Sequence, residues 1–129
     1  MKLKFWKKEE KIEEKPKEEV KISELEEICE DKEIYEMLFD TMFLDPRKIG
    51  TSMQEAYENA KKFEEAKDFT KAALWYKVAG GLAIYEGNVK KVKEYFGRYE
   101  KLSGRILPIL KDPEKAVKKA QEYYQKYLK

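Results

Sequence analysis

Signals that start and stop helices recur along this chain, and they restrict its fold more than any other feature. Ser52 followed by Glu55 forms a capping box, in which the hydroxyl accepts a hydrogen bond from an early amide and the glutamate reaches back to the cap. Ser23 and Glu26 repeat the pattern. The other signals are acidic or amide residues that begin helices and glycines that end them, namely Asp31, Asn88, Asp112 before Pro113, Gly87 and Gly104.

The apolar residues between these signals recur at helical spacing, as Ile22, Leu25 and Ile28 do. The sequence predicts a helix beginning near residue 22, a second from Asp31 to the Asp45-Pro46 step, and further helices near 53–67, 71–86, 89–103 and from 113 onward. Residues 105–111 are expected to form a packed linker or a short turn. Because no window alternates apolar and polar residues as a strand does, we predict an all-α helical bundle of five to six helices.

The 129 residues suffice for one folded domain with a charged extension. Residues 7–21 are nearly all Lys and Glu around Pro16, so we expect residues 1–20 to form a flexible charged N-terminal extension and residues 21–129 a single all-helical domain. No stretch approaches the ~20 apolar residues of a membrane span, and the start lacks the features of a secretory signal. A lone cysteine, Cys29, fits a reducing compartment, and a cytoplasmic location is expected.

Charged residues are unevenly chosen and unevenly distributed. Lysine (25) outnumbers arginine (3) and glutamate (21) outnumbers aspartate (5), a bias that predicts a thermophilic source. Residues 9–33 hold 12 acidic side chains against 5 lysines, whereas residues 89–129 hold 12 basic against 5 acidic ones. We expect these two segments to attract either an outside partner or each other.

Small and aromatic residues follow a regular spacing in the middle of the chain. They are Ala60, Phe63, Ala72, Tyr76 and Ala79, on either side of a corner at residues 67–69. Small residues let two antiparallel helices approach, and aromatic rings fill the space beside them. Over residues 53–86 this spacing resembles the tetratricopeptide (TPR) repeat, with Ala56, Asn59 and Ile84 where the repeat has Trp, Leu and Pro.

A second resemblance is to the microtubule-interacting and transport (MIT) domain, a bundle of three successive helices, through residues 94–102. Both resemblances imply a scaffold that binds peptides or helices of other proteins. The remaining interpretation is a plain helical bundle in which similar small-residue packing arose independently.

The TPR resemblance implies that the first helix of the hairpin lines a binding groove, through Gln54, Tyr57, Lys61 and Glu64. The function that we favour from the sequence is a non-catalytic protein–protein interaction module, an adaptor or a subunit of a larger complex, that binds a peptide or helix in a TPR-like groove.

A basic stripe on the last helix supports an alternative function. Its members are Lys115, Lys118, Lys119, Tyr123 and Lys126. Lysines contact phosphates and exposed aromatic rings stack on bases, so this stripe suits a small nucleic-acid-associated protein. Because Tyr123 and Tyr124 are adjacent, one of them is expected to be exposed or at an interface. The competing interpretation is a solvated basic face that pairs with the acidic N-terminal segment.

The sequence offers no catalytic, metal or cofactor site. The absence of histidine excludes Ser-His-Asp triads and His-ligated metals, and there is no nucleotide-binding motif, so we expect neither an enzyme nor a cofactor. Cys29 is expected to be a buried structural residue. Gly80 and Gly81 are expected to mark close contact with a crossing element, with a groove floor or hinge as the alternative.

Two further partners stay open. Leu3, Phe5 and Trp6 lie among lysines in residues 1–8, a composition that suits weak contact with an anionic membrane surface. A homo-oligomer is the other, because a short bundle leaves an apolar edge that a second copy can cover.

Overall fold

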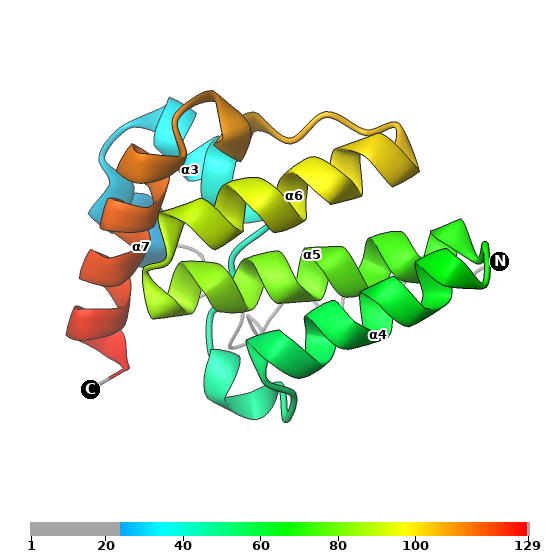
Figure 1. The fold of residues 1–129 in the computed structure, drawn as a ribbon. Coiled ribbons are helices and arrows are strands. Elements are labelled where there is room, and N and C mark those ends of the chain that lie inside the picture. The colour runs from blue at the N-terminus through cyan, green and yellow to red at the C-terminus, as the bar shows by residue number, and fades with distance from the viewer. Residues whose placement is uncertain (1–23, 129) are drawn as a thin grey trace, which may run out of the picture.

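The computed structural model describes residues 24–128, and every regular element within them is a helix (Figure 1). Residues 24–29 are helical, followed by α3 (Lys32–Phe39), the 3-10 helix η1 (Pro46–Lys48), α4 (Met53–Glu65), α5 (Phe69–Glu86), α6 (Val89–Ser103), the 3-10 helix η2 (Pro108–Lys111) and α7 (Pro113–Tyr127). This confirms the predicted all-α class. No helix in this part of the chain is long and apolar enough to cross a membrane. The expected extension, residues 1–20, and Ser23 lie outside the described residues.

The helix ends follow the predicted punctuation. Ser52 and Glu55 make both hydrogen bonds of a capping box at the start of α4. Four other side chains accept a hydrogen bond from an early amide of the helix that follows: Asp31, Asp68, Asn88 and Asp112. Gly87 and Gly104 close α5 and α6 with φ of 72° and 77°, the left-handed region that glycine adopts at least cost.

The second predicted helix is shorter than expected. The sequence predicts a helix up to Asp45-Pro46, whereas α3 stops at Phe39. The Thr41 hydroxyl donates a hydrogen bond to the Met37 carbonyl oxygen at 2.8 Å, a side-chain contact that competes with the helical ladder. Phe43 therefore lies outside the helix, and its ring packs beside Gly81 of α5.

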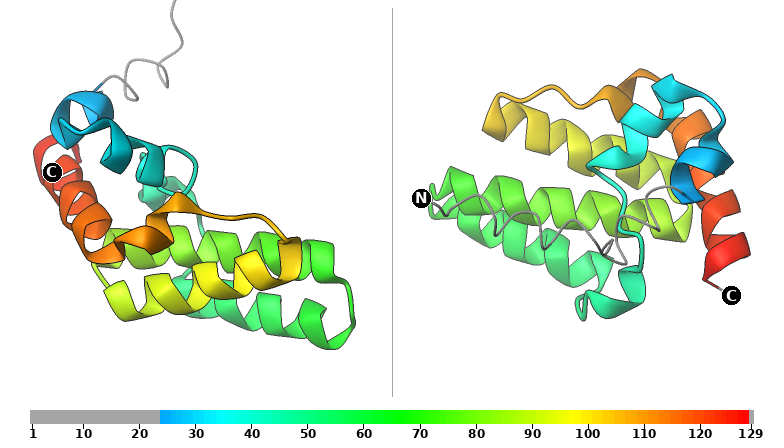
Figure 2. Two further views of the ribbon diagram at one scale, coloured as in Figure 1. Left: turned by 90° about the horizontal axis from the view of Figure 1, so that it is seen from above. Right: turned by 180° about the vertical axis from the view of Figure 1, so that it is seen from behind.

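Helices α4, α5 and α6 form a layer of antiparallel helices with α5 in the middle (Figure 1). Short turns join α5 to both neighbours, so α5 is covered along two sides. Figure 2 shows α7 and α3 at the end of this layer where α5 stops and α6 begins, and both views agree on this placement. Residues 104–107 carry the chain back from the far end of α6 to η2 and α7.

The glycine pair allows close packing at this covered end. A Cβ atom on Gly80 would lie 2.6 Å from the ring of Phe96, a buried residue of α6. One on Gly81 would lie 2.6 Å from the ring of Phe43 and 3.0 Å from the Thr41 carbonyl oxygen. The prediction of close contact is confirmed, and aromatic rings occupy the space that a groove floor would need.

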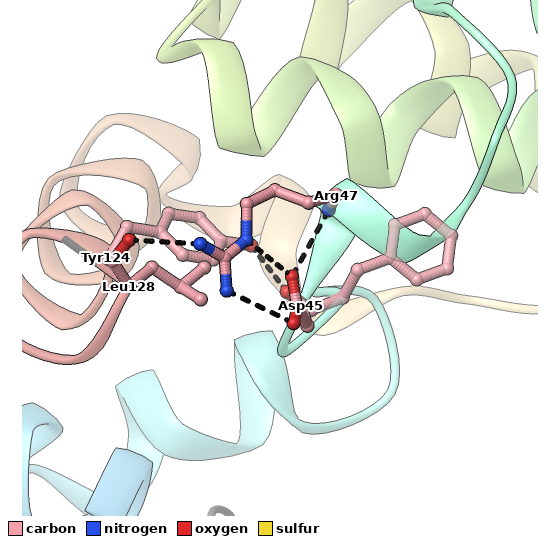
Figure 3. A network of polar contacts seen from close by, with 5 residues as sticks. Asp45, Arg47, Tyr124 and Leu128 are labelled. Carbon is pink, nitrogen blue, oxygen red and sulfur yellow. Dashed lines mark hydrogen bonds and ion pairs between the residues drawn. The ribbon is translucent and has the colours of Figure 1, made fainter.

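A polar network fixes the end of α7 to the segment before α4 (Figure 3). The Arg47 guanidinium pairs with Asp45, with 2.9 Å between Nε and Oδ1, and its Nη1 donates to the Leu128 carbonyl oxygen at 3.3 Å. The Tyr124 hydroxyl donates to the Phe43 carbonyl oxygen. The hydrogen bond from Arg47 lowers the pKa of the Asp45 carboxyl below its usual value.

Candidate functional site

The four residues predicted to line a groove on α4 divide into two pairs. Gln54 and Lys61 are exposed, and the Gln54 amide donates to Glu58 on the same helix at 3.0 Å. Tyr57 instead faces α6 and α5, with its ring centroid 5.4 Å from that of Tyr95 and 6.3 Å from that of Tyr76. Tyr57, in the middle of the predicted groove lining, therefore makes two aromatic contacts with neighbouring helices.

Glu64, the fourth residue, is partly buried and accepts hydrogen bonds from side chains of two other helices. Its Oε1 accepts a hydrogen bond from the Tyr76 hydroxyl at 2.7 Å, and its Oε2 pairs with Arg98 of α6. The Arg98 guanidinium also lies 5.6 Å from the centroid of the Tyr76 ring. Burial, with the bond to Glu64 adding to it, raises the pKa of Tyr76 to about 12. Tyr57 and Glu64 thus hold α4 against its neighbours, which leaves Gln54 and Lys61 as the accessible half of the set.

The basic stripe on α7 lacks its aromatic member. Lys115, Lys118 and Lys126 are exposed, while Lys119 is largely covered and pairs with Glu122 at 3.4 Å. Tyr123 is only 1% exposed, which corrects the expectation that it stands beside the lysines.

Tyr124 is buried as well, so neither member of the tyrosine pair is exposed. The reason is that α7 packs on both α3 and α5. The Tyr124 ring makes an edge-on contact with the Tyr85 ring of α5, at 5.1 Å between centroids. Burial, and to a lesser extent the negative charge of Glu24, raises the pKa of Tyr123 to about 12. Residues 24–33, the part of the acidic segment that the structure describes, therefore lie close to α7, with Glu24 near Tyr123 and Cys29 near Lys119.

Cys29 is buried, as predicted. Removal from water raises the pKa of its thiol to about 11, although Lys119 acts in the opposite direction. Within residues 24–128 no cluster of acidic, cysteine or histidine side chains is arranged to hold a metal ion.

A surface groove with an apolar lining lies between the first half of α5 and the end of α6. Its volume is about 480 Å³. The residues that line it include Phe69, Ala73, Leu74, Lys77, Tyr99 and Leu102. Ala73 and Tyr99 are buried and form its floor, whereas Leu74 is 58% exposed and Phe69 is 46% exposed.

The other end of the same two helices is closed. Helix α7 packs on both α5 and α6 there, and the Gln121 amide donates to the carbonyl oxygens of Ile84 and Tyr85 at 2.8 and 2.9 Å. Figure 1 shows α7 at this end, far from the start of α5 and the end of α6. The groove is therefore the part of the α5–α6 seam that α7 does not reach.

The groove is bordered by positive charge. Lys71 and Lys77 line it, and none of the described residues in its lining is acidic. The Lys77 ammonium lies 5.6 Å from the centroid of the Tyr99 ring, and the Lys71 ammonium lies 3.9 Å from Asp68.

Sequence reasoning missed this groove. Because α5 is apolar on nearly every face, its periodicity does not tell which face another element covers. The available signal was Leu74, a large apolar residue that the small-and-aromatic spacing of the hairpin does not use.

Comparison of the chain with protein-family models, with curated proteins and with solved structures gives no match.

Proposed function

We propose that this protein is a non-catalytic protein–protein interaction module, an adaptor or a subunit of a larger complex, and that it binds a helical segment in the α5–α6 groove. The observation that carries the proposal is the exposure of Leu74 and Phe69 above a buried floor of Ala73 and Tyr99. An apolar groove between two helices suits recognition of an amphipathic helix, whose side chains at positions i, i+3, i+4 and i+7 enter it. Binding of a partner would remove the exposed apolar side chains of Leu74 and Phe69 from water, which favours association.

Buried alanines support the TPR-like interpretation of residues 53–86, which implies this class of function. Ala60, Ala72 and Ala79 are fully buried at the positions where the TPR pattern has small residues. In a regular array of such hairpins a further helix follows and covers the seam, whereas here α7 covers one end of it. The MIT-like interpretation uses the same three helices and predicts the same class of partner.

Nucleic-acid binding through α7 is the weaker alternative. With Tyr123 buried, the stripe holds lysines without a ring that can stack on bases. Its exposed lysines are also interrupted by the exposed Glu114 and Glu122. A cytoplasmic location, a thermophilic source and weak membrane contact by residues 1–8 stay predictions from the sequence, and residues 1–8 lie outside the described residues.

The test compares capture by two variants. Tagged wild-type protein, Leu74→Glu and Lys118→Glu are incubated with lysate of the source organism, with and without nuclease treatment, and bound proteins are quantified by mass spectrometry. We expect Leu74→Glu to lose, and Lys118→Glu to keep, a stoichiometric protein that the wild type captures. Material that disappears on nuclease treatment and with Lys118→Glu favours the nucleic-acid alternative. A partner retained equally by both variants places the binding surface elsewhere.

A further inference from the structure

The open groove sets requirements for the element that fills it. The groove follows α5 from Phe69 to Lys77, which is about 12 Å of helix at 1.5 Å per residue. It is apolar along its floor, and its only charged lining residues among those described are lysines. A suitable occupant is therefore a short helix of about two turns with a large apolar side chain and acidic neighbours.

Helix α3 of this chain has those properties. It has 8 residues, or about 12 Å. Phe39 on its last turn is 57% exposed and packs against the half-buried Tyr35, with 5.7 Å between ring centroids. Each of these two aromatic residues is followed in the chain by an exposed acidic residue, Glu36 after Tyr35 and Asp40 after Phe39, and Glu33 in the first turn of α3 is exposed as well. The shallow surface pocket beside Tyr35 is lined by four acidic residues and a single lysine, Lys32.

Within one molecule these two surfaces cannot meet, because they lie at opposite ends of the helix layer. Figure 2 shows α3 over the end that carries α7, while the start of α5 and the end of α6 form the other end. A contact between them therefore needs two molecules.

We propose that the groove is filled by α3 of a second copy, so that the chain associates head to tail through Phe39 of one copy and Leu74 of the next. This inference rests on the proposed function of the groove and names its partner. The two surfaces differ, so the interface is heterologous, and repetition produces a ring or an open chain of subunits. The contact area of a two-turn helix is small, which places the affinity in the weak, transient class.

The experiment measures mass against concentration for the full chain, by sedimentation or light scattering, from about 10 µM to 1 mM, the range in which weak contacts of this kind saturate. Wild-type protein is expected to increase in mass with concentration. Leu74→Glu and Phe39→Ser are each expected to weaken association at least about 10-fold, the loss typical of a central apolar contact. Circular dichroism confirms that both variants fold, which their exposed positions permit.

The decisive measurement mixes the two variants. Leu74→Glu retains a working α3 and Phe39→Ser retains a working groove, so an equimolar mixture is expected to form a 1:1 dimer and nothing larger. Ile106→Ser, which removes an 80% exposed apolar side chain outside both surfaces, is the matched control and is expected to associate like the wild type.

Three results overturn the inference: a wild-type protein that stays monomeric throughout, a mixture that stays monomeric while the wild type associates, or association that is lost in only one of the two variants. The first of these leaves the proposed function standing if Leu74→Glu still abolishes capture of another protein. If that capture is also unaffected, the groove itself is not a docking site.

Discussion

The two ends of the α5–α6 seam are formed by the same pair of helices, yet α7 covers one end and leaves the other exposed. At the closed end, Gly80 and Gly81 leave space that the rings of Phe96 and Phe43 occupy, and α7 packs on both α5 and α6. At the open end, Leu74 and Phe69 stand exposed above Tyr99. The difference shows that a helix can be apolar all round and still be covered over only part of its length, and the uncovered part is where a partner gains most by binding.

The largest expected difference is between a side chain at each end. Phe96→Ala removes a fully buried ring from the closed end and should lower the free energy of unfolding by about 3–5 kcal/mol. Leu74→Ala at the open end should change it by no more than about 0.5 kcal/mol. Urea unfolding of both variants measures this, and equal losses would mean that the open end is covered in the folded protein.

The second largest effect is expected from replacing the helical glycines with alanine. Gly80→Ala and Gly81→Ala should each destabilise the protein by about 1–3 kcal/mol through overpacking, even though alanine favours helix by about 1 kcal/mol. Gly97→Ala is the matched control in α6, because nothing lies within 4 Å of its added Cβ, and it should stabilise the protein. Thermal unfolding gives the sign of each change, and three stabilising substitutions would contradict the close packing.

The hydrogen bonds from α7 to the end of α5 provide a smaller effect. Gln121→Met leaves the carbonyl oxygens of Ile84 and Tyr85 without this donor and should cost about 1–2 kcal/mol. Hydrogen exchange should become faster at the C-terminal turn of α5 and stay unchanged at its first turn. Gln125→Met, at an exposed position of the same helix, is the control and should have little effect.

At the open end, the turn between α4 and α5 holds a strained residue. Lys67 has φ of 63°, in the left-handed region that favours glycine. Lys67→Gly should therefore stabilise the protein by about 0.5–1 kcal/mol. The control Lys62→Gly, inside α4, should lower the free energy of unfolding by about 1 kcal/mol. A loss of stability from both substitutions would show that the Lys67 side chain contributes more than its backbone strain costs.

The remaining prediction concerns pH and the buried Cys29. Burial raises the pKa of Cys29 from 9.0 to about 11, so the folded state favours the neutral thiol. The resulting stability is fully present below pH 9 and is lost as pH rises toward 11, because the unfolded chain ionises first. Denaturant unfolding between pH 8 and pH 10 should show this decline together with one from the buried tyrosines, whose unfolded-state pKa is 10.0 and whose folded pKa is raised, and Cys29→Ala should make the total decline shallower. An unchanged slope in Cys29→Ala would assign the decline to other groups.

Apart from the end of α3, the helices and their ends were determined by the sequence alone, because caps and stops act within a few residues. The cap and stop residues form hydrogen bonds with backbone groups about one helical turn away, so their effect does not depend on the rest of the fold. Examples are Ser52 with Glu55, Asn88 after Gly87, and Gly104. The close packing of Gly80 and Gly81 was also predictable, since glycine inside a helix needs a reason to offset its cost.

What covers each helix face was decided by the tertiary structure. The sequence placed Tyr123 beside exposed lysines and Glu64 in a groove, but α7 packs on two elements and Arg98 reaches Glu64 from 34 residues away. The length of α3 depended on the same kind of contact, because Phe43 leaves the helical path and packs against Gly81. The open groove arises because the chain after α6 returns to the far end of the layer before α7 begins. Contacts between residues distant in sequence decide these outcomes, and local periodicity carries no information about them.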